Sequence, residues 1–268
     1  MRRLEERGIT LIELMVALAL TIIVVFAIYK VYLFQHKSYT VEDQVAEMQQ
    51  NARTAIDVMV REIRMAGFGV PTSNLSSWVD WVNGITINDT IQVVQGSGSD
   101  PDTIYIVGCF DPPPASLSTS ASSGDTSLTL KDETQASKFN TDKKKLISID
   151  GLENAIITNI YSNTLTIDTD PTTDGNQGLT RSYDADTPIY LVKVITYSIV
   201  SDTLKRNENT GGGAQPLAEN IEDLQISKSS DFINISLTAR TARPDPDYPE
   251  NNGYRKRTFT TRVKIRNE

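Results

Sequence analysis

The chain has 268 residues, a length that suits one large domain or two small ones. Its formal net charge of −8 argues against a nucleic-acid partner, because phosphate binding requires clustered lysine and arginine. A single cysteine, Cys109, excludes an intramolecular disulfide, and a single histidine, His36, leaves little material for a histidine-based metal or catalytic site.

The N-terminal segment is predicted to cross a membrane. Residues 14–29 carry no charge, and the apolar run reaches back to Ile9 with one interruption, Glu13. About 20 apolar residues are enough to span a bilayer. Arginines precede the run, as the positive-inside rule expects for a cytoplasmic N-terminus. The long C-terminal part is therefore expected on the other side of the membrane.

Two simpler explanations of this segment fit less well. A secretory signal peptide would end in a small-x-small cleavage site, whereas the apolar run continues into residues 29–34 without one. A plain membrane anchor leaves Glu13 unexplained, because an unpartnered carboxylate at membrane depth costs about 3 kcal/mol. Such a residue is expected to have a function and a partner.

The stretch RGITLIELMVAL, residues 7–18, resembles the type III signal of type IV pilins and type II secretion pseudopilins. The resemblance implies that residues 1–8 are a leader, which a prepilin peptidase removes by cutting between Gly8 and Ile9. It also implies methylation of the new amine of Ile9. Glu13 would then act in assembly by pairing with the N-terminal amine of a neighbouring subunit.

Physical reasoning supports a partner for Glu13 but leaves two readings open. A buried charge requires a counter-charge, so a pair between subunits would set the register of otherwise similar apolar helices. Alternatively, Glu13 interacts within its own chain, since a carboxylate is favourable in the first turn of a helix. The two are compatible, and the intersubunit role is favoured because capping alone would not require placement in lipid.

Apolar residues recur every three or four positions between Gln44 and Gly67, which predicts one amphipathic helix. Because no proline or glycine interrupts residues 9–66, this helix is expected to continue the apolar one over roughly 87 Å. A homomeric coiled coil is less favoured for a run of about three heptads. The predicted buried stripe is Val45, Met48, Ala52, Ile56, Met59, Ile63 and Ala66, and the predicted solvent face is Gln49, Gln50, Arg53, Asp57, Arg61, Glu62 and Arg64.

The remainder of the chain is predicted to be β-structure. Five longer strand candidates are Asp89–Gln95, Thr103–Phe110, Pro188–Val200, Phe232–Arg240 and Arg257–Ile265. Four shorter ones are Thr126–Leu130, Lys145–Asp150, Ala155–Tyr161 and Asn163–Asp168. The short, regularly spaced strands suggest a small β-barrel or sandwich inserted into the head, in preference to a long decorated loop.

The expected fold class is α+β. By resemblance it is the pilin fold, in which a long N-terminal helix with a membrane half and an amphipathic half packs on an antiparallel sheet. The expected divisions are a leader (1–8), a transmembrane and assembly helix (9–33), a globular head (34–110 and 188–268) and an inserted β-rich module (111–187).

Residues 52–67, 195–199, 204–206 and 217–224 are similar to the corresponding parts of PilW-type minor pilins. The J-type pseudopilin of type II secretion shares this layout. The resemblance covers residues 1–110 and 188–268. It implies a role in assembling, priming or capping a type IV pilus, with other major and minor pilins, the prepilin peptidase and the inner membrane as partners.

The implied location is the bacterial inner membrane, with a single pass and a periplasmic C-terminal part, and then the assembled pilus at the cell surface. Two other functions remain open. One is a minor pseudopilin of type II secretion, and the other is a membrane-tethered adhesin that uses the inserted module.

No catalytic constellation is found, so neither an enzyme nor a cofactor is expected. Cys109 lies in a strand candidate and is expected to be a small buried apolar residue. The acidic segment 168–176 lacks the spacing of an EF-hand loop and is expected to be a solvated loop, and segment 245–253 is expected to be an exposed connection between the last two strands. Weak calcium binding by the acidic loops stays open. The glycines at 211–213 are expected to form a flexible hairpin tip.

Overall fold

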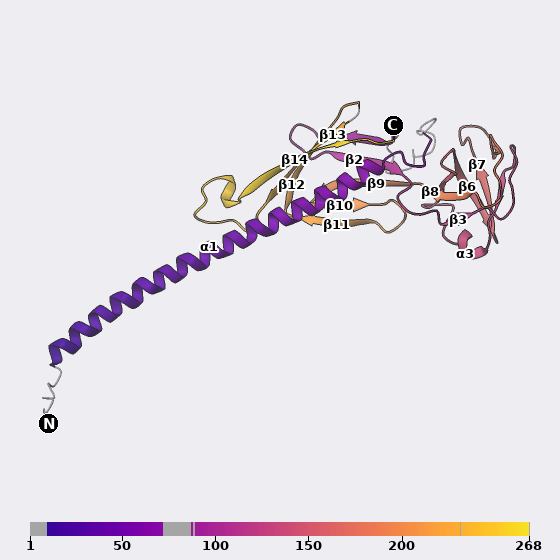
Figure 1. Ribbon diagram of the computed structural model, residues 1–268. Coiled ribbons are helices and arrows are strands. Elements are labelled where there is room, and N and C mark those ends of the chain that lie inside the picture. Colours follow the sequence, from indigo (N-terminus) through magenta and orange to yellow (C-terminus); the bar gives the residue numbers. More distant parts are fainter. Residues whose placement is uncertain (1–9, 72–86, 88, 231, 268) are drawn as a thin grey trace, which may run out of the picture.

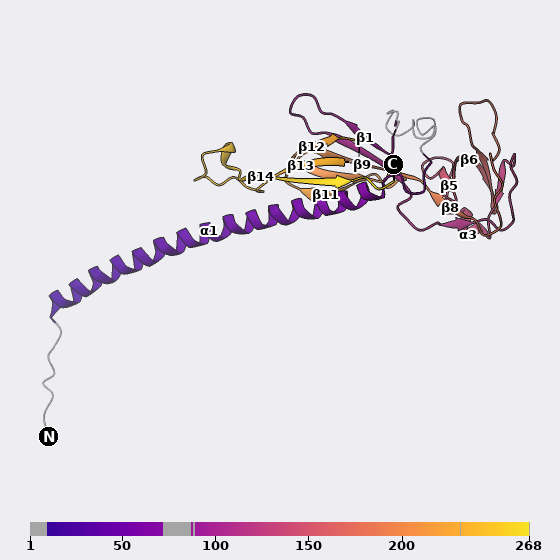
Figure 2. The same cartoon turned by 45° about the horizontal axis from the view of Figure 1, so that its top comes forward.

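The computed structural model describes residues 10–71, 87, 89–230 and 232–267. Its α+β class agrees with the prediction: one long helix precedes a part built from antiparallel sheets. The helix, α1 (Leu11–Met65), projects far beyond the head at its N-terminal end, and a second β-rich body lies at the opposite end (Figures 1 and 2).

The strands form three sheets, in each of which the hydrogen-bonded neighbours are antiparallel. The five-stranded sheet has the order β1 (Ile91–Val94), β2 (Thr103–Gly108), β9 (Lys193–Val200), β10 (Thr203–Asn207), β11 (Ala214–Glu219). The three-stranded sheet consists of β12 (Ile221–Lys228), β13 (Phe232–Arg240) and β14 (Lys256–Lys264). The six-stranded sheet has the order β3 (Ala115–Ser116), β8 (Pro188–Leu191), β5 (Leu146–Ile149), β6 (Glu153–Tyr161), β7 (Thr164–Asp168), β4 (Ser127–Thr129). The described residues also contain two short helices, α3 (Glu133–Ala136) and the 3₁₀ turn η1 (Asn251–Gly253).

The uninterrupted helix predicted from the sequence is present. At 55 residues, α1 is about 82 Å long. It ends where Gly67 adopts a φ of +73°, which favours glycine. A Cβ atom at this position would also lie 2.3 Å from the carbonyl oxygen of Asn267. The helix therefore stops where the C-terminal end of the chain crosses it.

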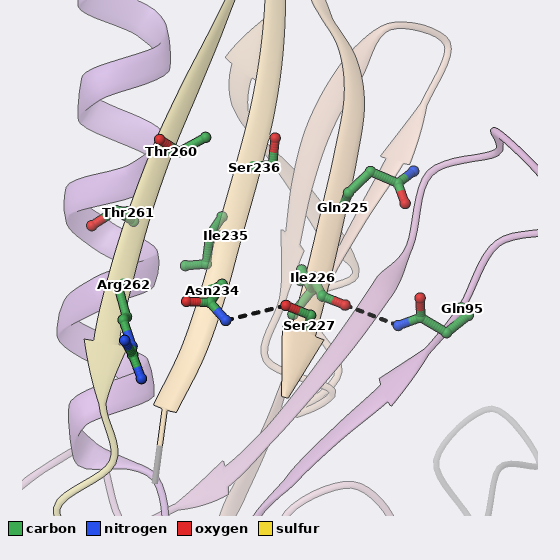
Figure 3. A pocket seen from close by; sticks show the side chains of 10 residues that line it. All are labelled: Gln95, Gln225, Ile226, Ser227, Asn234, Ile235, Ser236, Thr260, Thr261 and Arg262. Atoms are coloured by element: carbon green, nitrogen blue, oxygen red, sulfur yellow. Dashed lines mark hydrogen bonds between the residues drawn. The ribbon is translucent and has the colours of Figure 1, made fainter. Parts of the chain in front are cut away.

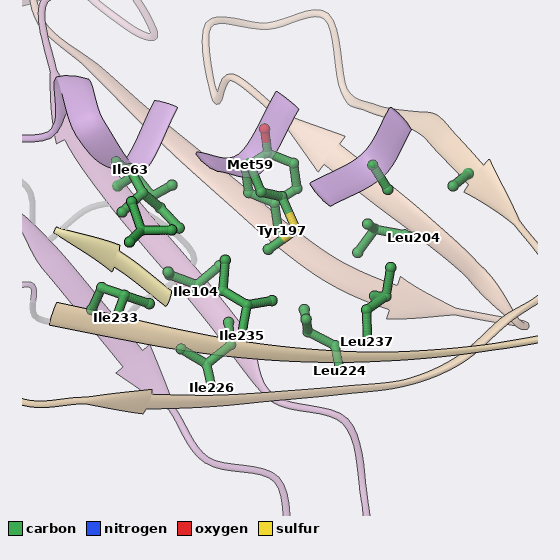
Figure 4. Close-up of a cluster of buried hydrophobic side chains, with 14 of the residues drawn as sticks. Met59, Ile63, Ile104, Tyr197, Leu204, Leu224, Ile226, Ile233, Ile235 and Leu237 are labelled. Carbon is green, nitrogen blue, oxygen red and sulfur yellow. The ribbon is translucent and has the colours of Figure 1, made fainter. Parts of the chain in front are cut away.

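The C-terminal half of α1 packs on both sheets of the head. Five of the seven predicted stripe residues are buried, and Val45 and Ile56 are half-buried at its margins. Figure 4 shows helix side chains converging with those of the five-stranded and three-stranded sheets. The buried residues of this main core of the head are Met48, Ala52, Ala55, Met59, Ile63, Ala66, Ile91, Ile104, Ile106, Ile195, Tyr197, Leu204, Ala218, Ile221, Leu224, Ile226, Ile233, Ile235, Leu237, Ala239, Val263 and Ile265.

The assignment of Glu62 to the solvent face was wrong, because its side chain is buried and only 5% of the residue is exposed. Its carboxylate accepts hydrogen bonds from Arg206 Nη2 at 2.7 Å and Nε at 3.0 Å, and the hydroxyl of Tyr197 donates to it. Burial and the neighbouring carboxylate raise the pKa of Tyr197, which keeps this donor protonated. A buried carboxylate is tolerated only with such partners, and those partners lie more than 130 residues away in sequence.

The charge network continues from Glu62 to the edge of the head. Arg206 Nη1 lies 2.8 Å from Glu208, and Lys193 lies 2.8 Å from Glu208 and 2.5 Å from Asp111. Asp111 follows β2, at the point where the chain leaves the head. The network thus connects the helix, the five-stranded sheet and the exit toward the second β-rich body.

The six-stranded sheet forms a small barrel within the distal β-rich body. Its two end strands meet through a bridge between Leu117 and Leu130, and the amide of Ser118 donates to the carbonyl of Thr129 at 2.8 Å. The barrel encloses its own core, to which α3 contributes Ala136. The predicted short strands correspond to β4, β5, β6 and β7.

The single strand predicted over residues 188–200 is instead two strands in different sheets. The segment β8 belongs to the barrel, and β9 belongs to the head, with Val192 between them. The barrel sheet therefore extends to Leu191, beyond the expected boundary at 187. Composition cannot reveal this change, because both segments are equally rich in β-forming residues. Since β2 pairs with β9, the chain leaves and re-enters the head at one end of a single ladder.

A shared apolar core joins the barrel to the head. The head contributes residues from β2 and β9, from the segment after α1 and from the segment before β1, the barrel contributes Leu146 of β5, and Val192 lies at the junction of β8 and β9. The buried members are Val70, Ile87, Tyr105, Val107, Cys109, Leu146, Val192 and Val194. The amide of Asn154 also donates to the carbonyl of Pro71 at 3.0 Å. The barrel is therefore packed on the head and not tethered by a linker.

We expect Glu62→Ala to destabilise the head by about 1.5–3 kcal/mol, because the buried hydroxyl of Tyr197 would lose its acceptor and Arg206 would keep only Glu208 as a counter-charge. The measurement is equilibrium urea unfolding of the detergent-solubilised chain, followed by β-sheet circular dichroism. Asp57→Ala, at an exposed position on the same helix, is the control and should change stability by less than about 0.5 kcal/mol. Equal effects would show that the buried pair is not important for stability.

We expect Cys109 to be unreactive in the folded chain. Burial raises the pKa of its thiol to about 12, so roughly one thiol in ten thousand is ionised at pH 8. Iodoacetamide should leave the native protein unlabelled and label it fully in urea, as read by mass. Rapid labelling without denaturant would contradict the shared core between barrel and head.

Candidate functional site

Glu13 takes part in capping the N-terminus of α1 through a contact within its own chain. Thr10 is the N-cap, and its hydroxyl accepts a hydrogen bond from the amide of Glu13 at 3.3 Å. In return, Glu13 Oε2 accepts from the amide and from the hydroxyl of Thr10, each at 2.9 Å. This reciprocal arrangement is a capping box. The intrachain interaction considered for Glu13 is thus observed, and Oε1 has no partner among the described residues.

The predicted cleavage site, Gly8 and Ile9, lies outside the described residues. Its position in the sequence still relates it to the cap. A cut after Gly8 would place the new amine on Ile9, directly before the N-cap Thr10. The ammonium and the carboxylate of Glu13 would then both belong to the first turn of the helix.

The apolar half of α1 has no packing partner within the described part of the chain. Its large apolar side chains from Leu11 to Phe34 are between 44% and 78% exposed. By length and composition this helix could cross a membrane. An open hollow of about 320 Å³ lies on the helix surface beside Glu13. Its lining consists of Glu13, the small side chain of Ala17, and Ile12, Val16 and Leu20. An apolar surface of this extent requires lipid or other helices to cover it.

A loop of the head contacts α1 just beyond the C-terminal end of this apolar half. The loop, residues 241–255, connects β13 to β14, and its Asp245 is only 8% exposed. Lys37 lies 3.7 Å from Asp245 and also pairs with Asp247, and Arg255 lies 2.9 Å from Asp245. The backbone amide of Arg243 donates to the side chain of Gln44 at 3.0 Å. The segment predicted as an exposed connection is therefore partly a docking element.

We call this contact between residues 241–255 and residues 37–44 the collar. It lies at the boundary between the apolar and the amphipathic half of the helix. Two cavities of about 330 and 310 Å³ flank Lys37 between the helix and the loop. Hydrogen bonds from Arg255 and from the amide of Asp247 lower the pKa of Asp245, and hydrogen bonding to Asp247 raises the pKa of Lys37. Both groups thus stay charged near neutral pH, and the collar holds the helix at a fixed place on the head.

The acidic loop at residues 168–176 uses its carboxylates internally. Asp170 accepts hydrogen bonds from the hydroxyls of Thr172 at 2.5 Å and Thr173 at 2.9 Å, which lower its pKa. Asp168 accepts from the amides of Asp170 and Gln177. Over the described residues, no group of three or more His, Cys, Asp or Glu side chains is placed to hold a metal ion.

Comparison with known proteins gives a specific match at the N-terminus. Residues 3–29 match the family model of the prokaryotic N-terminal methylation motif, a motif of structural pilins. An uncharacterized protein of Aquifex aeolicus is 30% identical over 103 residues, which is 38% of this chain and 37% of that protein. No solved structure matches the chain. The motif and the long apolar helix fit membrane anchoring and support a pilin-like or pseudopilin-like role.

We expect the collar to open in acid. Because the pKa of Asp245 is lowered on folding, its contribution to stability is present above the unfolded value near 4 and is lost as the pH falls below it. Hydrogen exchange of residues 241–255, corrected for the intrinsic rate, should stay slow from pH 8 to 5 and become fast only as the pH falls below about 4 and through the lowered pKa of Asp245. Asp245→Asn should give fast exchange already at pH 7, whereas the exposed Asp174→Asn should not. Slow exchange in the Asp245 variant would refute the collar contacts.

Proposed function

We propose that the chain is a minor pilin that assembles into, primes or caps a type IV pilus through its N-terminal helix. The observation that carries this proposal is the methylation motif on a helix whose apolar half is uncovered and whose other half is fixed to a folded head. A soluble globular protein has no use for such a surface, whereas a subunit that moves from a bilayer into a helical bundle requires it.

The proposed processing follows from the resemblance described above. The prepilin peptidase cuts between Gly8 and Ile9 on the cytoplasmic side, and Ile9 is methylated at its amine. Glu13 then contributes to assembly. Lipid tails and apolar helix faces are equally hydrophobic, so burial alone gives little preference for the bundle. An ammonium and a carboxylate that pair between chains would supply that preference and fix the register.

The capping box is compatible with this role. In the chain by itself, Thr10 satisfies one carboxylate oxygen of Glu13 and leaves Oε1 available. The hollow beside Ala17 leaves room for a neighbouring helix at the level of Glu13. The intrachain contact would keep the carboxylate partnered until an amine from another subunit approaches.

The position of the barrel supports a minor subunit, present in few copies, over a major one. The barrel is packed on the end of the head that lies farthest from the helix N-terminus (Figure 1). In a filament of parallel subunits, it would occupy space where a subunit farther from the membrane would otherwise sit. A subunit at the tip of the filament, with no subunit farther from the membrane, does not meet this obstacle.

The proposed location is the bacterial inner membrane, with a single pass and the head in the periplasm, and then the pilus at the cell surface. The proposed partners are other major and minor pilins, together with the prepilin peptidase. Two alternatives share the same N-terminus. A type II secretion pseudopilin would be recovered with the secretion filament and not with pili. An adhesin would lose adhesion, but not assembly, when a short turn replaces the barrel between the paired strands β2 and β9.

We expect Glu13→Ala to leave cleavage intact and to reduce incorporation into sheared pili at least tenfold, because the amine of the neighbour loses its partner. Thr10→Val is the matched control: it removes the hydroxyl of the capping box but keeps the carboxylate. Processing is read by the mass of the membrane-bound chain, and incorporation by quantitative blotting of pili. If Thr10→Val is as defective as Glu13→Ala, capping explains Glu13; if both assemble normally, the proposed role of Glu13 is wrong.

A further inference from the structure

A groove crosses the outer face of the three-stranded sheet, on the side away from α1 (Figure 3). Its volume is about 480 Å³. Side chains with hydroxyl or amide groups dominate the lining, and Arg262 is the one charged member of the set. The set is Gln95, Gln225, Ile226, Ser227, Asn234, Ile235, Ser236, Thr260, Thr261 and Arg262.

One wall of the groove is built and fixed by a buried carboxylate. Asp102 is 1% exposed, and its carboxylate accepts hydrogen bonds from the amides of Ile226 at 2.7 Å and Gly96 at 2.8 Å. Its own amide donates to the carbonyl of Leu224 at 2.8 Å. Gln95 adds a hydrogen bond to the carbonyl of Ile226 at 3.0 Å. Residues 95–102 therefore cover the edge of β12, which leaves the groove unable to add a peptide strand on that side.

The side chain of Arg262 is oriented by an aromatic ring. Its guanidinium lies 3.9 Å from the ring centroid of Phe232, in a cation–π contact. Three other cations near this sheet have carboxylate partners: Arg240 at 2.7 Å, Arg255 at 2.9 Å and Lys256 at 2.5 Å. Within the described part of the chain, Arg262 has no such partner. A guanidinium held in this way offers a planar pair of donors that matches a carboxylate or a sulfate.

The sheet surface beside Arg262 carries polar groups that have no hydrogen-bond partner among the described residues. Asn234 donates to Ser227 at 3.2 Å and keeps its carbonyl oxygen unused among the described residues. The hydroxyls of Ser236 and Thr260 make no hydrogen bond to any described residue. The strand register places Ser236 opposite Thr260 and Asn234 opposite Arg262, so these groups form two adjacent rows on one face. Their short side chains leave space above the sheet.

We propose that this groove binds an acidic glycan. The carboxylate or sulfate of one sugar would pair with Arg262, and the hydroxyls of the chain would exchange hydrogen bonds with Asn234, Ser236 and Thr260. The chemistry of the lining favours this class, because an oxyanion would meet Arg262, the charged side chain of the lining, and a polyol would meet its neutral donors and acceptors. The side chains of Ile226 and Ile235 point into the core, so the polar side chains of the lining are the ones that face a ligand.

The site lies on the head and not on the barrel, so the proposal is independent of the adhesin alternative discussed above. It is also independent of processing and assembly, because it requires only the folded head. The ordinary alternative is a solvated sheet face with no ligand, and the experiment below separates the two.

The test is binding by the purified full-length chain in detergent to fluorescent tetrasaccharides of galacturonate, mannuronate and glucuronate. Each uronate is paired with its methyl ester, which removes the charge and retains the sugar. We expect at least one uronate to bind, with an affinity at least tenfold above that of its ester. Arg262→Gln should weaken that binding at least tenfold, and Asn234→Ala should weaken it severalfold.

Arg257→Gln is the matched control, because it removes the same charge from the same strand on the opposite face. It should change the affinity less than twofold, and circular dichroism should show all variants folded. Failure of all three uronates to bind at millimolar concentration would overturn the proposal. So would equal binding of acid and ester, or equal effects of the Arg262 and Arg257 substitutions.

Discussion

Burial of the amphipathic half of α1 against two sheets is the interaction on which the rest of the structure depends. It provides the main core of the head, and it holds the apolar half of the same helix outside that core. The ion pair between Glu62 and Arg206 adds an electrostatic contact to this apolar packing. The collar at Lys37 holds the helix at the opposite edge of the head. A single rigid element thus links the surface that must be covered by lipid or by other helices to the folded part that it carries.

Two carboxylates on this helix show how environment determines the role of a side chain. Glu62 is enclosed by its partners, and the folded chain satisfies both its oxygens. Among the described residues Glu13 has a local partner, Thr10, and it lies among exposed apolar side chains. The first carboxylate therefore contributes to the stability of the head, whereas the second retains capacity for a partner from outside the chain. The same residue type on one helix is thus used for packing at Glu62, whereas at Glu13 it is proposed to act in recognition.

The sequence predicted the parts that depend on local pattern. The uninterrupted helix, its buried stripe and strands such as β13 follow from periodicity, because one face of each element is buried. The sequence did not predict contacts that depend on distant residues: the burial of Glu62 requires Arg206, and the docking of Asp245 requires Lys37. Strands β10 to β12 were also missed, because their polar edges and Pro216 obscure alternation. The groove at Arg262 depends on register between strands, which composition does not reveal.

The central claim is that this helix begins at a processed N-terminus and joins other subunits through it. The most direct test is the intact mass and N-terminal residue of the chain recovered from the membranes of the producing bacterium. The account predicts a chain that begins with N-methylated Ile9 and lacks residues 1–8. An intact Met1, or a chain that begins beyond Phe34, would contradict it, because the apolar segment would then be a simple anchor or a secretion signal.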